Sequence, residues 1–174
     1  MPRTTSVLDH LWRELEGSPL TPIPDLSRKY AVPEGMIFEH LRSKGVAKVR
    51  KDCWGRTLEG IRSWGTIRLR VRNDGAAVDL TVASDRLHWT ETEITAEGEG
   101  LRLNVRFNSV AAIYFLEDFP GCMPTVVFCN KRGRCVLEVY VERSEHPLKQ
   151  FRETRDATCV GYLEGPTPEG CGRL

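Results

Sequence analysis

The feature that most constrains this chain is a side-chain alternation of period two that begins after Gly65. Apolar residues alternate with arginines from 67 to 72, and successive side chains of a strand point to opposite faces of a sheet. Asn73-Asp74-Gly75 is typical of a tight turn, and a second alternating segment follows at 78–82. These residues predict an antiparallel hairpin with one apolar face and one face that carries Arg68, Arg70 and Arg72.

The same pattern continues to residue 141 and sets the fold class. Further strands are expected at about 86–95, 101–107, 110–117, 125–130 and 135–141. A closing helix is expected at about 145–157, with Pro147 near its start. We therefore predict an α+β fold, with an antiparallel sheet of about seven strands, N-terminal helices and a C-terminal helix.

The N-terminal quarter is predicted to be helical. An apolar stripe with helical spacing runs from Val7 to Leu15, and short helices are expected at 25–30 and 34–41. The last two have the outline of a helix-turn-helix, but the third helix is rich in apolar residues and carries acids, so we favour packing or dimerisation over DNA reading. The predicted organisation is a helical segment at 1–52, a sheet domain at 53–160 and a flexible tail at 161–174.

The charge balance argues against a mainly electrostatic nucleic-acid binder. The 174 residues include 25 Lys and Arg and 24 Asp and Glu, a formal net charge of +1. The charge is unevenly placed, because residues 41–72 contain ten basic residues and only two acidic ones. No apolar run approaches the roughly 20 residues of a membrane helix. The N-terminus also lacks the apolar core of a signal peptide, so we expect a cytoplasmic protein.

The sequence contains no recognisable catalytic or zinc motif. The six cysteines form no CxxC pair, and the four histidines are not spaced to complete a zinc site. Reduced, mostly buried thiols are the default, although Cys129 and Cys135 flank a predicted turn and could approach each other across it. Nucleophile-elbow, Walker and dinucleotide-binding motifs are missing from the sequence, so binding is favoured over enzymatic chemistry.

The arginine rows are candidates for anion binding. Arg102 and Arg106 share a strand face in the same way as the three arginines at 68–72. A guanidinium offers a planar fork of donors to carboxylates or phosphates. The structural alternative is that acids such as Asp79 neutralise these arginines across the sheet.

Four segments have a distinctive order and spacing: 58–65, 110–117, 119–123 and 126–141. The clearest part is the last, a strand, a turn of the Asn-Lys-x-Gly type and a strand ending in Tyr-Val. Over about residues 5–157, the chain resembles the heme-utilisation family of ChuX and HutX, which is related to the half-repeats of the HemS and ChuS proteins. The resemblance implies cytosolic proteins that bind heme on an antiparallel sheet, often as dimers, and store it or pass it to a heme-degrading partner.

The resemblance also focuses the search for a site. Arg72 and Asn104 stand where relatives have candidate iron-ligating histidines, which makes His88 the axial candidate here, with Cys122 or Met123 as weaker ones. The hypothesis is that an aromatic surface covers the macrocycle while arginines bind its propionates. The predicted heme-binding residues are His88, Trp89, Arg68, Arg70, Arg72, Arg102, Arg106 and Tyr114, with Phe107 beside them. A DNA-binding regulator and a divergent module that binds something other than heme are the alternatives.

Overall fold

A computed structural model describes residues 4–17, 22–42, 45–73, 76–98, 100–117, 123–142 and 144–159. The predicted tail at 161–174 and the candidate Cys122 lie outside these residues. None of the helices in the described part of the chain combines the length and hydropathy that crossing a membrane requires.

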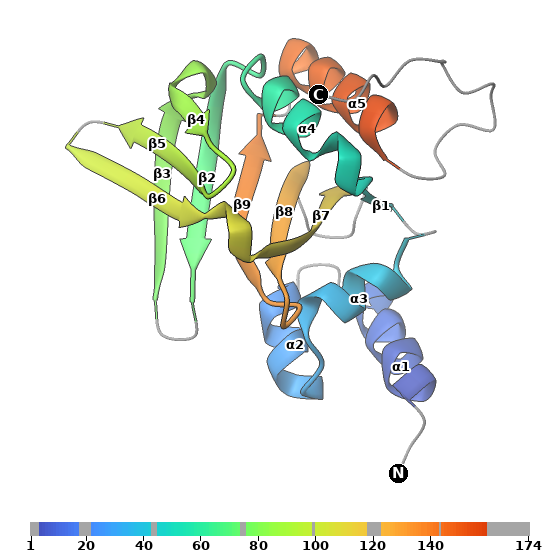
Figure 1. Ribbon diagram of the computed structural model, residues 1–174. Helices are drawn as coiled ribbons and strands as arrows, with labels where there is room; N and C mark the ends of the chain where they lie inside the picture. Colours follow the sequence, from blue (N-terminus) through green and yellow to red (C-terminus); the bar gives the residue numbers. More distant parts are fainter. Residues whose placement is uncertain are drawn as a thin grey trace.

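The centre of the molecule is a six-stranded antiparallel sheet (Figure 1). Its strand order is β1-β7-β8-β9-β2-β3, so the segment from residue 110 to 141 forms the middle and the predicted hairpin at 66–83 forms one edge. The hairpin register pairs Arg68 with Thr81 and Arg70 with Asp79. The strands are β1 (Val46–Lys48), β2 (Thr66–Arg72), β3 (Ala77–Ala83), β7 (Val110–Leu116), β8 (Thr125–Asn130) and β9 (Cys135–Val141).

A second sheet of three antiparallel strands lies against the β2–β3 end of the first (Figure 1). It consists of β4 (Leu87–Trp89), β5 (Glu93–Gly98) and β6 (Leu101–Arg106). The strand predicted at 86–95 is divided between β4 and β5 because the Thr90 hydroxyl accepts the backbone N–H groups of Thr92 and Glu93 and forms a turn. This division, together with the unpredicted β1, gives nine strands in two sheets within the described residues instead of about seven in one.

The main core lies between the two sheets and two helices. Ile67, Leu69 and Val82 of the large sheet pack with Ile94 and Val105 of the small one. The helices α4 (Trp54–Ile61) and α5 (Glu145–Thr158) cover the rest of this face (Figure 1). Buried rings fix their position, and the ring pairs have centroids 5.0–6.3 Å apart: Trp64 with Phe115, Trp64 with Phe151, and Phe115 with Phe151.

Three N-terminal helices pack on the opposite face of the large sheet: α1 (Thr4–Gly17), α2 (Ile23–Tyr30) and α3 (Glu34–His40). The ring of Phe38 on α3 lies 5.4 Å from that of Tyr114 on β7. Because helices cover this face while α5 and the small sheet cover the other, β7 and β8 are apolar on both sides. This explains the nearly continuous apolar sequence at 110–117.

The helix-turn-helix outline is a packing arrangement. Helix α2 ends at Ala31, which has a left-handed φ of 53°, and α3 begins directly after Pro33. Ile37 and Phe38 are buried against the sheet, so α3 is fixed on its apolar side. The remaining elements are short 3₁₀ turns at Lys51–Cys53, Ser84–Arg86 and Phe107–Ser109. The α+β class with N-terminal helices and a C-terminal helix is confirmed, and the domain boundary at residue 52 stays a prediction.

Candidate functional site

The arginine row of β2 lies on the outer face of the large sheet, away from the main core. The Arg70 guanidinium binds both carboxylate oxygens of Asp79, at 2.9 and 3.0 Å. Arg68 stacks on Tyr140, with its guanidinium carbon 4.4 Å from the ring centroid. The cross-strand neutralisation considered for Asp79 is therefore present, and Arg68 is the exposed member of the row.

Arg72 forms ion pairs with two buried carboxylates of the protein, so its guanidinium is not available to an external anion. Its Nε donates to Glu138 at 2.9 Å, and its Nη2 donates to Glu34. Burial alone would lower the pKa of Arg72, but the carboxylates of Glu138 and Glu34 raise it. The second oxygen of Glu34 accepts the backbone N–H of Cys135 at 2.9 Å. Arg72 and Glu34 thus connect α3 to β2 and β9.

The other predicted residues belong to the small sheet. His88, Arg102 and Arg106 are exposed on its outer face. Arg102 lies 3.7 Å from Glu97, and Arg106 stands opposite Glu93 in the ladder. Trp89 points the other way, packs on the main core and has the Arg62 guanidinium 5.9 Å from its ring centroid.

The structure does not bring the eight predicted residues together on one surface, and heme binding by any of them stays a prediction. The two sheets stack through their apolar faces, so their polar faces, with Arg68 on one and His88 on the other, point in opposite directions. Tyr114 lies on neither of these polar faces: its side chain is buried beneath α3 and is only 2 % exposed. The prediction assumed a single sheet, in which alternation would have put all arginines on one side.

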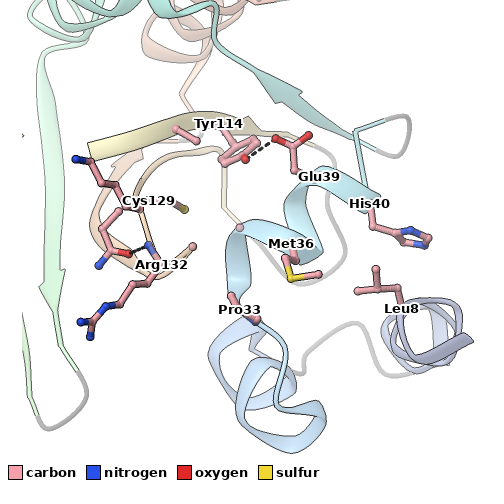
Figure 2. A pocket seen from close by; sticks show the side chains of 13 residues that line it. Leu8, Pro33, Met36, Glu39, His40, Tyr114, Cys129 and Arg132 are labelled. Carbon is pink, nitrogen blue, oxygen red and sulfur yellow. Dashed lines mark hydrogen bonds between the residues drawn. The ribbon is translucent and has the colours of Figure 1, made fainter. Parts of the chain in front are cut away.

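A groove of about 620 Å³ lies elsewhere, along the exposed side of α3 (Figure 2). Helix α3 contributes one stripe of residues, α1 contributes Leu8, and the turn between β8 and β9 forms the opposite wall. We call this cavity the helix–hairpin groove. Its lining residues are Leu8, Pro33, Gly35, Met36, Glu39, His40, Ala112, Tyr114, Cys129, Asn130, Lys131, Arg132 and Gly133.

The helix side of the groove combines apolar surface with a histidine. Met36 is 43 % exposed, although its neighbours Ile37 and Phe38 are buried. His40 lies one helical turn further on, and its Nε2 is 3.5 Å from Oδ1 of Asp9 (Figure 2 shows Met36 and His40 on the side of Leu8). A carboxylate beside one ring nitrogen orients an imidazole. Met36 and His40 therefore present a thioether and an imidazole to the groove from α3.

Glu39 holds the inner wall of the groove in place. Its carboxylate accepts the Tyr114 hydroxyl at 2.8 Å and the Lys48 ammonium group (Figure 2 shows the first bond). Burial opposes ionisation of Glu39, but these two hydrogen bonds outweigh it and lower the pKa of the carboxyl. Burial, followed by the bond to Glu39, raises the pKa of Tyr114 far above its usual range, so its phenol stays protonated.

The hairpin side of the groove is cationic. Within the described residues, Lys131 and Arg132 have no carboxylate oxygen within 4.0 Å. The turn is rigid because the Asn130 side-chain oxygen accepts the backbone N–H groups of Arg132 and Arg134, at 2.9 and 3.1 Å. A second cavity of about 560 Å³ lies on the far side of this turn and is lined by Arg28, Arg72, Arg132 and Arg134. We call it the arginine pocket.

Sequence reasoning missed this groove. Its cations were noted only as part of a turn, and its histidine only as a polar residue on a packing helix. The available signal was Met36, an apolar residue on the side of α3 opposite to Ile37 and Phe38. The Arg132 and His40 side chains come from segments about ninety residues apart, so their proximity depends on the tertiary fold.

Two stacked antiparallel sheets, flanked by helices and with a half-apolar groove beside α3, define an α+β protein with a cavity of small-molecule size. The haem utilisation ChuX/HutX family model matches residues 47–154, which is more than half of the chain. The chain therefore belongs to this family, as its sequence resemblance predicted.

Solved structures share the fold over most of the chain. The heme binding protein ChuX is 16% identical, with a TM-score of 0.66, over 84% of this chain and 97% of that one. A protein of Agrobacterium tumefaciens is 19% identical, with a TM-score of 0.71, over 88% of this chain and 92% of that one. The heme-bound form of PhuS, a heme-binding protein of Pseudomonas aeruginosa, is 12% identical, with a TM-score of 0.75, over 97% of this chain and 51% of that one. A comparison with curated proteins found no match.

Proposed function

We propose that this protein binds heme in heme utilisation, and that the macrocycle enters the helix–hairpin groove. The observation that carries the proposal is the lining of the groove. Apolar surface, a thioether and an imidazole lie on one side, and Lys131 and Arg132, which have no carboxylate partner among the described residues, lie on the other. The volume of about 620 Å³ falls in the usual range for small-molecule sites. Membership of the haem utilisation family supports heme as the ligand class.

The donor set fits heme iron. Imidazole and thioether are both established axial ligands of heme, and the groove exposes one of each, on His40 and Met36. Asp9 beside His40 supports the imidazole as the ligand of choice. Tyr114 is not suited to be the iron ligand, because its phenol is buried, protonated and hydrogen-bonded to Glu39. Its ring instead forms part of the apolar wall of the groove.

The propionates need cations that are not already neutralised. Arg70 and Arg72 are committed to Asp79, Glu34 and Glu138. Lys131 and Arg132 are exposed at the rim of the groove, and the guanidinium can bind a carboxylate with two hydrogen bonds. We therefore assign the propionates to the hairpin turn.

The small sheet is the alternative location. His88 is exposed there and has Arg102 and Arg106 on the same face. Both arginines face acids across the ladder, Glu97 and Glu93, which reduces the positive potential available to a propionate. Binding of heme at the small sheet remains an alternative proposal, and the hemin titration described below distinguishes it from binding in the helix–hairpin groove.

We further propose that the bound heme is stored or passed to a heme-degrading partner, that the protein works in the cytoplasm, and that it forms a homodimer. These proposals rest on the family and on the shared fold. Light scattering at micromolar concentration checks the dimer, with a mass of twice 19.7 kDa as the expected result.

The test is a titration of the purified protein with hemin, followed by the Soret band. The wild type and His88→Ala should give the same saturable Soret shift. In His40→Ala the band should move, and affinity should fall by at least about tenfold, because the iron loses its donor. Loss of the shift in His88→Ala, with His40→Ala unaffected, would transfer the site to the small sheet. The absence of any Soret shift in the wild type would overturn heme binding altogether.

A further inference from the structure

Two cysteines face each other across the hairpin that separates the groove from the arginine pocket. Cys129 on β8 and Cys135 on β9 are paired in the antiparallel ladder, directly after a register shift between Phe128 and Cys129. Their Sγ atoms are 3.4 Å apart, and both residues are reduced and buried. Paired residues of such a ladder have Cα atoms about 4.5–5.5 Å apart, which lies inside the range of about 4.4–6.8 Å found for disulfides. The backbone can therefore accept a bond between the two sulfur atoms.

The two sulfurs differ in their surroundings. Cys129 lines the helix–hairpin groove, which has room for water-sized molecules, whereas Cys135 lines the arginine pocket. Burial raises the pKa of the Cys135 thiol well above its usual value, and the neighbouring Cys129 raises it further. Cys129 is 1 % exposed and Cys135 3 %, so each sulfur is reached from a different cavity, and an oxidant in the groove meets Cys129 with Cys135 behind it.

We propose that Cys129 and Cys135 are a modification site, at which a peroxide converts the two thiols into a reversible disulfide. The Cys129 sulfur attacks one peroxide oxygen, the O–O bond breaks, and a sulfenic acid and one water are formed. The Cys135 sulfur then attacks the Cys129 sulfur, the S–O bond breaks, and hydroxide leaves with the Cys135 proton as a second water. The two cysteines lose two electrons in total, and the peroxide gains them.

The other two located cysteines provide an internal comparison. Cys53 is fully buried and its sulfur accepts a hydrogen bond from Arg50 at 2.9 Å. Burial raises the pKa of the Cys159 thiol, and Cys53 is one of the groups that raise it further, but among the described residues no sulfur–sulfur hydrogen bond joins these two cysteines as one joins Cys129 and Cys135. Oxidation is therefore expected to select one pair out of four thiols.

The experiment uses the full chain with Cys122→Ser and Cys171→Ser, so that only the four located cysteines remain. The reduced protein receives stoichiometric hydrogen peroxide, free thiols are alkylated, and peptides are mapped after trypsin digestion. Lys131, Arg132 and Arg134 lie between the two cysteines, so trypsin separates them and a disulfide appears as a linked peptide pair. The expected result is a linked pair of the Cys129 and Cys135 peptides whose mass is lower by two hydrogen atoms. The thiols of Cys53 and Cys159 should remain free, and dithiothreitol should reverse the link completely.

Two variants distinguish the pair from general oxidation. In Cys135→Ser, the sulfenic acid on Cys129 has no partner, so labelling by dimedone should rise at least about tenfold over the parent. In the matched control Cys53→Ser, the linked pair should form as before. Four free thiols after treatment, or a Cys129 sulfinic acid with Cys135 still reduced, would overturn the proposal. Because no step uses heme, failure here leaves the proposed function untouched.

Discussion

At the scale of single residues, Arg72 shows what alternation can and cannot predict. The period of two in β2 correctly placed Arg68, Arg70 and Arg72 on one face. It could not reveal that Arg72 meets Glu34 and Glu138, which are 38 and 66 residues away along the chain. Whether an arginine is open to a ligand depends on such distant partners, so the candidate site was less predictable than the strand that carries it.

Removing the Arg72 side chain should therefore lower the free energy of unfolding far more than removing that of the exposed Arg68. Arg72→Ala leaves the buried carboxylates of Glu34 and Glu138 without a cation, and we expect a loss of about 3–5 kcal/mol in the free energy of unfolding. Arg68→Ala removes an exposed cation–π contact and should cost about 1 kcal/mol or less. Urea denaturation of the two variants measures both values. Equal losses would contradict the structural role of Arg72.

Glu39 makes stability depend on pH. Its pKa in the folded protein is lowered from the ordinary 4.5, so the folded state binds this proton less tightly than the unfolded state. The stabilisation is complete above the ordinary value and is lost as the pH falls through the lower folded-state pKa. Glu39→Gln should therefore flatten the fall in stability between about pH 5 and pH 3.

Thermal unfolding at a series of pH values tests this. Glu16→Gln is the control, because the Glu16 carboxylate makes no ion pair among the described residues and is exposed on α1. An unchanged slope in Glu39→Gln would mean that the bonds to Lys48 and Tyr114 do not favour the carboxylate.

At the scale of elements, the junction between α3 and the β8–β9 turn determines the shape of the groove. The Gly35 N–H donates to the Gly133 carbonyl at 2.7 Å. A Cβ on Gly35 would lie 3.1 Å from the Gly133 Cα, and Gly133 has a φ of +72°. Two backbones thus approach more closely than most side chains allow.

Adding a methyl group at this junction should separate the two elements. Gly35→Ala is expected to lower the free energy of unfolding by about 1–3 kcal/mol through overpacking against Gly133. The matched control is Gly55→Ala in α4, where nothing lies within 4 Å of the new methyl, so helix propensity should raise stability by up to about 1 kcal/mol. The melting temperatures of the two variants should move in opposite directions. A decrease of equal size in both would show that the contact is not tight.

Elements were the most predictable level of this molecule. The stripe at 7–15, Pro33 and Pro147 predicted helices close to their observed positions, because local spacing and proline stereochemistry decide such segments. The division of the strand at 86–95 and the short β1 were missed. The first depends on a hydroxyl of Thr90 that caps a turn, and the second on pairing with β7, which is distant in sequence.

At the scale of the whole molecule, layering separates the predicted site into three places. The alternating strands β2, β3 and β6 were predicted with the correct apolar face, but a set of such strands can form one curved sheet or two stacked ones. Stacking placed His88 and Arg68 on opposite outer faces, and the helix–hairpin groove lies elsewhere, where α3 meets the hairpin turn. The family resemblance correctly predicted the fold, whereas the ligand position required the tertiary arrangement.

The most direct test of heme binding in the helix–hairpin groove is hemin affinity after the groove has been filled. Ala112→Trp places an indole in the groove, while Thr81→Trp places the same group beside Arg68 on the outer face of the large sheet. We predict that Ala112→Trp abolishes the saturable Soret shift and that Thr81→Trp binds hemin like the wild type. Undiminished binding by folded Ala112→Trp protein would contradict the account.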